Sequence, residues 1–143
     1  MKVISHRGNL YGKSEVENNP LQVKVCLERN IECEIDVRWV NDEWFLGHDT
    51  AEYNIPQRFL IDNKDMLWCH AKNVEALEKM MELNLHCFWH QSDQYTITSR
   101  GVVWAYPEQY TSRGVLVLPS KSFIDKHINN VYGICVDNPM EYL

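Results

Sequence analysis

The feature that most limits how this chain can fold is a series of short, almost uninterrupted apolar runs. Each run is bounded by turn-forming residues. Such runs are typical of buried strands in a sheet that is covered on both faces. In the first half of the chain they alternate with segments of helical spacing, an order that predicts parallel βα units. The runs lie at residues 3–5, 31–40, 66–70, 86–89, 101–106, 115–118 and 133–136.

Helix boundaries are marked most clearly in the first half. Asn19 followed by proline is typical of a helix start, with asparagine as the N-cap, and Asn30 suits a left-handed stop. Asn73 is the expected N-cap of a second helix that ends near Asn84. A short third helix is expected over residues 122–129.

The chain has 143 residues, which predicts a single domain over 1–143. The expected fold is α/β, a compact or reduced TIM-type (βα) barrel. A full eightfold barrel needs ~250 residues and seldom fewer than ~200. Several outer helices are therefore expected to be shortened to loops.

Charge and composition limit the kinds of partner that the protein can be expected to bind. The net charge is −6 and the basic residues are scattered, so the sequence shows no basic stripe of the kind that binds a nucleic-acid backbone. No apolar run approaches the ~20 residues of a membrane span, and the start of the chain is too short and polar for a signal peptide. Five cysteines without a C-x-x-C pair are interpreted as reduced core thiols. These features predict a cytoplasmic protein that binds a small molecule in a locally positive pocket.

Glu34 and Asp36 are the strongest metal-ligand candidates. Residues two apart on a strand point to the same face, with Cβ atoms about 6–7 Å apart, close enough to share one cation. Two buried carboxylates repel each other unless a positive charge compensates them. We expect a divalent metal there; the alternative is a structural salt bridge with Arg38 or Arg7.

Two histidines follow extended segments and suit proton transfer, because the imidazole pKa lies near neutral pH. His6 begins His6-Arg7-Gly8 after the first strand, and His48 follows a glycine after the hairpin. Arg7 can hold a phosphate or orient a carboxylate. Taken alone, His6 also fits a capping role in a loop, and His48 is unremarkable.

His70 and Lys72 share one face at the end of the third buried strand. His70 could ligate the metal or bond to substrate, and Lys72 could neutralise a phosphate oxygen. A solvated lysine at the following helix cap is the alternative for Lys72.

Three further residues are candidates for substrate binding. Glu17 could ligate the metal, hold Arg7 or cap a turn. His90 ends a strand and could line a pocket. Trp104 could form a substrate wall, with core packing as its alternative.

An ordered set of motifs resembles the glycerophosphodiester phosphodiesterase family, to which the barrels of phosphatidylinositol-specific phospholipases C and spider-venom phospholipases D are related. The end of the chain, residues 133–139, is similar to the last barrel strand of that family. The resemblance therefore spans the chain, with its middle compressed. The motifs are His6-Arg7-Gly8, Glu17-Asn18, Glu34-Ile35-Asp36 and His48-Asp49.

The resemblance implies a metal-dependent phosphodiester hydrolase of lipid metabolism acting on a glycerophosphodiester-like substrate. His6 and His48 would form the acid–base pair, Glu34 and Asp36 would bind the metal, and Glu17 would lie near it or brace Arg7. Lys72 matches a lysine that follows a carboxylate by two positions. Here that carboxylate position is His70, and a nitrogen ligand suits manganese or zinc better than calcium or magnesium. The metal is therefore expected to be Mg, Ca, Mn or Zn.

Two alternatives stay open. One is a catalytically inactive phosphate-ligand binding or regulatory protein on the same fold, which the histidine at position 70 and the short chain favour. The other is a half-barrel that completes itself in a homo-oligomer.

Overall fold

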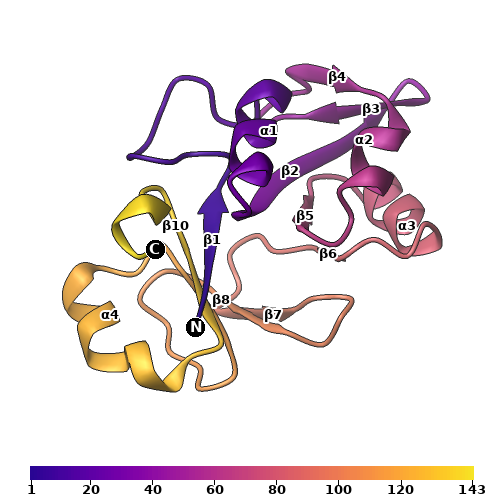
Figure 1. Ribbon diagram of the computed structural model, residues 1–143. Helices are drawn as coiled ribbons and strands as arrows, with labels where there is room; N and C mark the ends of the chain where they lie inside the picture. The colour runs from indigo at the N-terminus through magenta and orange to yellow at the C-terminus, as the bar shows by residue number, and fades with distance from the viewer.

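The computed structural model describes residues 1–143 as one curled sheet with short helices beside it (Figure 1). The nine-residue strand β2 is the longest and pairs with three other strands. The elements are β1 (Lys2–His6), α1 (Pro20–Glu28), β2 (Glu32–Val40), β3 (Glu43–Leu46), β4 (Tyr53–Ile55), α2 (Gln57–Asp62), β5 (Leu67–Ala71), α3 (Val74–Glu82), β6 (Cys87–Phe88), β7 (Tyr95–Ile97), β8 (Val103–Ala105), β9 (Gly114–Val117), α4 (Lys121–His127) and β10 (Gly133–Val136), with 3₁₀ turns at Ile128–Asn130 and Pro139–Glu141.

The sheet is mixed. Parallel strands neighbour one another in the order β6-β5-β2-β1-β10-β9-β8. The antiparallel pair β3 and β4 extends the second half of β2, and β7 lies antiparallel to β8. The first and last strands of the chain, β1 and β10, are therefore neighbours at the centre of the sheet.

The prediction of a reduced TIM-type barrel is wrong. The ten strands form a curled half-barrel, in which β6 and β8 do not pair, and strand and helix do not alternate regularly around it. Between β6 and β9 the chain forms only β7, β8 and turns, and no helix. The alternation of the first half does not continue because these connections are too short to hold helices.

The predicted helix boundaries are confirmed. Asn19 and Asn73 cap α1 and α3, each accepting a backbone hydrogen bond at 3.0 and 3.1 Å respectively. Asn30 and Asn84, just beyond the two helices, have left-handed φ angles of 60° and 55°. The expected third helix is α4. None of the helices combines the length and the apolar character needed to cross a membrane.

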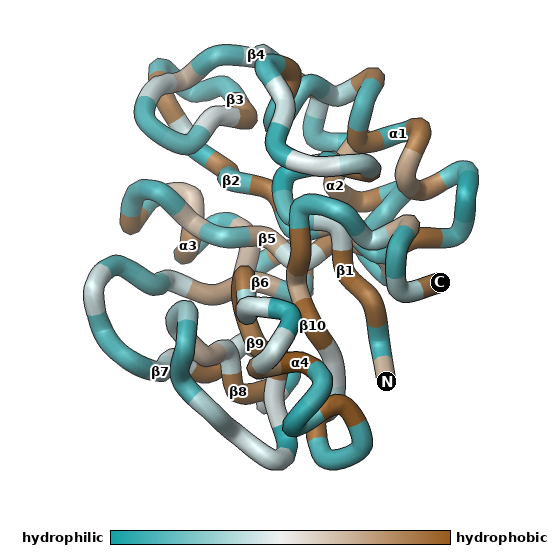
Figure 2. Tube along the Cα trace, turned by 90° about the vertical axis from the view of Figure 1, so that its left-hand side faces the viewer, coloured by the Kyte–Doolittle hydropathy of each residue, from teal (hydrophilic) through white to brown (hydrophobic).

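Apolar side chains fill both faces of the sheet. The largest cluster packs the sheet against α1, α2 and α3. A smaller group, here called the inner apolar cluster, fills the concave side below the strand ends. Strands β1, β6 and β10, which carry three of its members, contain brown stretches in Figure 2. Its members are Ile4, Trp68, Phe88, Trp104, Val115 and Cys135.

All five cysteines are buried and free, which confirms their interpretation as core thiols. Burial raises the pKa of the Cys69 thiol and raises that of Cys135 well above its ordinary value. These two thiols therefore stay protonated and act as small apolar groups in the packing.

Candidate functional site

The strand register brings the polar candidates together at one end of the half-barrel. His6 lies beside Glu34 in the β1–β2 pairing, and Asp36 lies beside His70 in the β2–β5 pairing. Side chains two residues apart on a strand share a face. His6 and His70 therefore stand directly above Ile4 and Trp68 of the inner apolar cluster, and this cluster forms the floor of the site.

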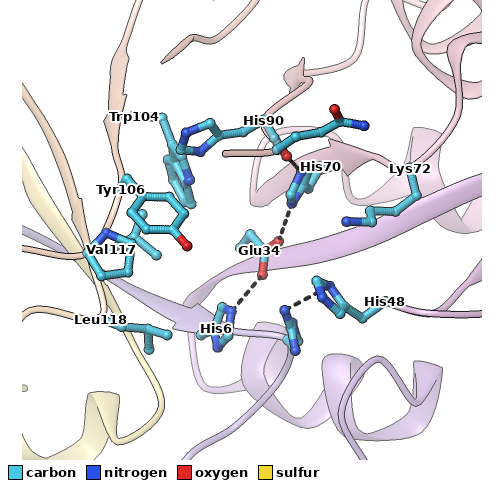
Figure 3. Close-up of a pocket in the computed structure, with 13 residues that line it drawn as sticks. His6, Glu34, His48, His70, Lys72, His90, Trp104, Tyr106, Val117 and Leu118 are labelled. Carbon is cyan, nitrogen blue, oxygen red and sulfur yellow. Dashed lines mark hydrogen bonds and ion pairs between the residues drawn. The ribbon is translucent and has the colours of Figure 1, made fainter. Parts of the chain in front are cut away.

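A cavity of about 460 Å³ opens above that floor (Figure 3). One wall is polar and comes from β1, β2, β5 and the turn after β3, while the opposite wall is largely aromatic and aliphatic. The polar wall comprises His6, Arg7, Glu34, His48, His70 and Lys72; the other comprises His90, Gln91, Trp104, Tyr106, Pro107, Val117 and Leu118. Of the ten predicted site residues, eight line this cavity, Asp36 lies beneath it, and Glu17 lines a neighbouring polar cavity.

Glu34, Asp36 and His70 converge closely enough to share one ion. Their potential ligand atoms lie within 4.8 Å of one another. Both carboxylates are buried, and Glu34 Oε2 and Asp36 Oδ1 have no hydrogen-bond partner. Such buried, unpartnered oxygens are rare and costly in native proteins. The donor set of two carboxylates and one imidazole fits a divalent cation.

Without a cation, His70 supplies the compensating positive charge. Burial alone would lower its pKa, but Asp36 and Glu34 outweigh burial and raise the pKa to about 9. Burial would likewise raise the pKa of Asp36, yet His48, His70 and Arg7 hold it well below its usual range. Asp36 therefore remains an anion at neutral pH.

Asp36 is held by two residues from the loop after β1. Arg7 Nε lies 3.0 Å from Asp36 Oδ2, and Asn18 Nδ2 donates to the same oxygen at 2.9 Å. Asn18 Oδ1 also accepts from the Asp36 backbone N–H at 2.9 Å. Glu17 contacts Arg7 at 3.5 Å, so it braces the arginine rather than joining the metal-ligand group. Asn18 received no role from sequence reasoning, although it lies in one of the resembling motifs.

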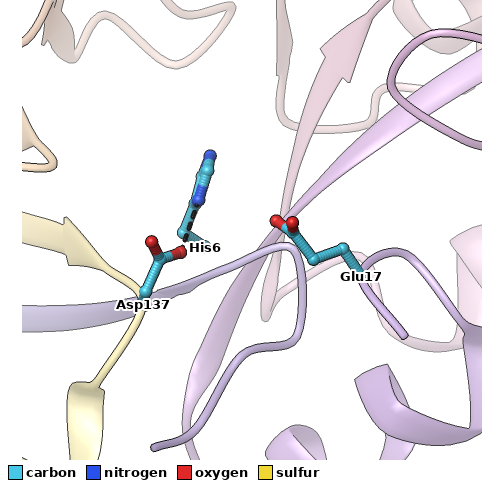
Figure 4. Close-up of side chains that lie close together, drawn as sticks. All are labelled: His6, Glu17 and Asp137. Carbon is cyan, nitrogen blue, oxygen red and sulfur yellow. Dashed lines mark hydrogen bonds and ion pairs between the residues drawn. The ribbon is translucent and has the colours of Figure 1, made fainter. Parts of the chain in front are cut away.

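His6 is oriented by Asp137, a residue that the sequence-based site did not include. The His6 Nδ1–H donates to Asp137 Oδ1 at 2.7 Å, leaving Nε2 toward the cavity, 4.0 Å from Glu34 Oε2 (Figures 3 and 4). Burial alone would lower the pKa of His6, but Asp137 and Glu34 outweigh burial, and the pKa is raised. The sequence contains a signal that could have identified Asp137. It directly follows β10, His6 is the last residue of β1, and these two strands are neighbours in the sheet.

His6, Glu17 and Asp137 also place ligand atoms within 4.8 Å of one another (Figure 4). The His6 Nδ1, Glu17 Oε2 and Asp137 Oδ1 atoms, however, already have partners. Asn9 Nδ2 donates to Asp137 at 2.8 Å and to Glu17 at 3.2 Å. This second group is a hydrogen-bonded support for His6, in contrast to the unpartnered oxygens of Glu34 and Asp36.

His48 is placed by the turn after β3. A Cβ at Gly47 would lie 1.9 Å from the Thr50 carbonyl oxygen, so only glycine fits the turn. Arg7 Nη2 lies 2.8 Å from His48 Nδ1. Because a guanidinium can only donate, Nδ1 of the neutral ring accepts and the proton is on Nε2, whereas in the charged ring Nδ1 can donate to Asp36 Oδ2, 3.4 Å away. Arg38 bonds the Gly47 carbonyl at 2.9 Å and so stabilises this turn instead of pairing with the acids.

The remaining predicted residues differ in their surroundings. Lys72 lines the cavity and its ammonium forms no ion pair, so its charge is available to an anion. The His90 ring bonds the Asp93 carbonyl at 2.5 Å and meets Tyr106 edge-on. Trp104 is almost fully buried and packs on Phe88 at 4.6 Å between ring centroids, so most of it belongs to the core.

Comparison with known proteins assigns no family to this chain: no protein-family model matches it, and no curated protein or solved structure is significantly similar. The resemblance to glycerophosphodiester phosphodiesterases therefore stays a prediction that rests on residues 6–49 and 133–139. The function has to be argued from the geometry of the cavity.

Proposed function

We propose that this chain is a metal-dependent phosphodiester hydrolase acting on a small, glycerophosphodiester-like substrate in the 460 Å³ cavity. One observation carries the proposal. Two buried carboxylates, each with one oxygen that has no hydrogen bond, lie within 4.0 Å of imidazole nitrogens of His6, His48 and His70, which line the same cavity. Metal-dependent phosphodiester hydrolysis uses these elements: a cation, a base and an acid.

Glu34, Asp36 and His70 would hold the cation, which when bound polarises a phosphoryl oxygen. Lys72, free of any ion pair, adds positive charge where the phosphate would lie. Arg7 directs its donors to Asp36, Glu17 and His48, so we assign it mainly to holding these groups in place. This local positive charge would let a protein of net charge −6 bind an anion.

His6 suits the role of general base. Its Nδ1–H bond to Asp137 fixes the ring and leaves Nε2 able to accept a proton from the attacking hydroxyl. His48 would act as the general acid in its imidazolium form: its Nε2–H protonates the leaving alkoxide and the ring becomes neutral, the state in which Nδ1 can accept from Arg7. The two histidines would therefore begin the reaction in opposite protonation states, His6 neutral and His48 charged.

The experiment is hydrolysis of bis(p-nitrophenyl) phosphate by chelator-treated protein after addition of Mn²⁺, Zn²⁺, Mg²⁺ or Ca²⁺. We expect turnover that depends on added metal and is abolished in His6→Ala and His48→Ala, with circular dichroism unchanged. His127→Ala, on α4 and outside the cavity, is the matched control and should keep full activity. Near-normal turnover in either site variant would show that the acid–base assignment is wrong.

The alternative of a phosphate-binding protein without catalysis gives a different result in the same assay. Wild-type protein would then bind inorganic phosphate in a saturable, metal-dependent way but release no p-nitrophenol with any of the four metals. That outcome would refute the hydrolase and retain the metal site.

A further inference from the structure

Two contacts that do not involve Glu34 or Asp36 fix the ring of His70. Its Nε2 lies 2.7 Å from the backbone carbonyl oxygen of His90. Its plane stacks on Phe88, with ring centroids 5.0 Å apart and planes 17° from parallel. The hydrogen bond sets the rotation of the ring and the stacking sets its tilt, so the direction of Nδ1 is determined before any ligand binds.

The His90 contact also determines which nitrogen carries the proton. A carbonyl oxygen can only accept, so Nε2 is the donor, and in the neutral ring Nδ1 then holds a lone pair. Nδ1 faces the carboxylates, at 3.3 Å from Asp36 Oδ1 and 3.7 Å from Glu34 Oε1 (Figure 3). A metal-binding histidine usually shows this arrangement, with its second nitrogen bonded to a carbonyl.

The two carboxylates support this interpretation independently. Glu34 and Asp36 are 2% and 0% exposed, and each has one buried oxygen without a hydrogen bond. Asp36 Oδ1 lies 3.3 Å from His70 Nδ1, so a cation bound by both would take the place of a proton between them. Two carboxylates and one pre-oriented imidazole therefore surround a position that suits a cation.

We infer that this position selects a transition metal of the Mn²⁺ or Zn²⁺ class over Mg²⁺ and Ca²⁺, with His70 Nδ1 as a direct ligand. Magnesium and calcium are hard ions that take oxygen ligands, and magnesium keeps much of its water. Imidazole nitrogen suits the borderline transition metals. The inference deepens the proposed function by naming its metal class, but it rests on the ligand geometry and not on turnover.

The test is Mn²⁺ binding to the full chain after chelator treatment, followed by pulsed electron paramagnetic resonance. We expect the spectrum of bound Mn²⁺ to show a directly coordinated ¹⁴N nucleus. Mg²⁺ should displace half of the Mn²⁺ only at roughly 100-fold excess or more, whereas Zn²⁺ should displace it at comparable concentration.

His70→Asp supplies the matched variant, because it replaces the nitrogen ligand with oxygen. It should still bind Mn²⁺ but lose the ¹⁴N coupling, and its preference for Mn²⁺ over Mg²⁺ should fall roughly tenfold or more. His127→Asn, outside the cavity, should behave as wild type. If His70→Asp does not fold, the wild-type spectrum and the Mg²⁺ competition still decide the question.

Bound Mn²⁺ without ¹⁴N coupling, equal competition by Mg²⁺, or no Mn²⁺ binding at all would overturn the inference. The outcomes also separate it from the proposed function. Nitrogen-coordinated Mn²⁺ in a protein that hydrolyses no diester would refute only the hydrolase. Efficient hydrolysis with Mg²⁺ and no preference for Mn²⁺ would refute only the metal class.

Discussion

Removal of the imidazole of His70 should destabilise the metal-free protein in a strongly pH-dependent way. In the folded chain the pKa of His70 is raised to about 9 from an ordinary 6.5, because Asp36 and Glu34 outweigh the effect of burial. A group whose pKa is raised by folding stabilises the fold fully below its unfolded pKa. That stabilisation is then lost as the pH rises through the folded pKa. The relevant window therefore runs from about pH 6.5 to about pH 9.

The magnitude follows from the two pKa values. Each pKa unit corresponds to about 1.4 kcal/mol, so the contribution is on the order of 3 kcal/mol. Little of it is lost to solvent screening, because the His70 side chain is only 14% exposed. For a domain of this size, 1 kcal/mol shifts the melting temperature by roughly 3 °C, so the full effect is about 10 °C.

The assay compares wild type with His70→Gln in chelator, by denaturant titration at about pH 6 and about pH 10. The variant should be less stable than wild type by about 3 kcal/mol more at the lower pH than at the higher one. Other groups that titrate in this range, including the buried thiols, are common to both proteins and cancel in the difference. A difference in unfolding free energy that does not change with pH would refute the ion pairing assigned to His70.

Three further outcomes are expected. Asp137→Asn should lower turnover and move the acid limb of the pH–activity profile to lower pH, because the pKa of His6 falls when this carboxylate is removed. Asp125→Asn, at an exposed position, is the control. An acid limb that does not move in Asp137→Asn would contradict the role of Asp137. Trp104→Ala should cost about 3–5 kcal/mol of unfolding free energy in denaturant titrations, whereas a loss below about 1 kcal/mol would show that Trp104 is not a core residue. Mn²⁺ at about 100 times its dissociation constant should raise the unfolding free energy by ~2.7 kcal/mol in calorimetry, and no rise would argue against the metal site.

Local features of the site could be predicted from the sequence because they depend on neighbours along the chain. Strand alternation alone places Glu34 and Asp36 on one face, and turn chemistry alone marks Asn19 and Asn73 as caps. These features are in the structure where the sequence expects them.

Features that depend on distant parts of the chain could not be predicted in the same way. The closed barrel was expected because βα alternation in the first half was extended to the second, yet whether β6 meets β8 depends on the pairing of remote strands. Asp137 and Asn18 were missed for the same reason. Asp137 reaches His6 only because β10 lies beside β1, and Asn18 reaches Asp36 only through the left-handed turn at its own φ of 64°.

The two walls of the cavity come from stretches of the chain that do not overlap. The side chains that we propose to transfer protons and bind a cation all come from residues 6–72, whereas the aromatic and aliphatic wall comes from residues 90–118. Substitutions in the second stretch can therefore reshape the space offered to a bound molecule without displacing the groups of the first. A chain built in this way can diversify what it accommodates while the polar wall of the cavity stays the same.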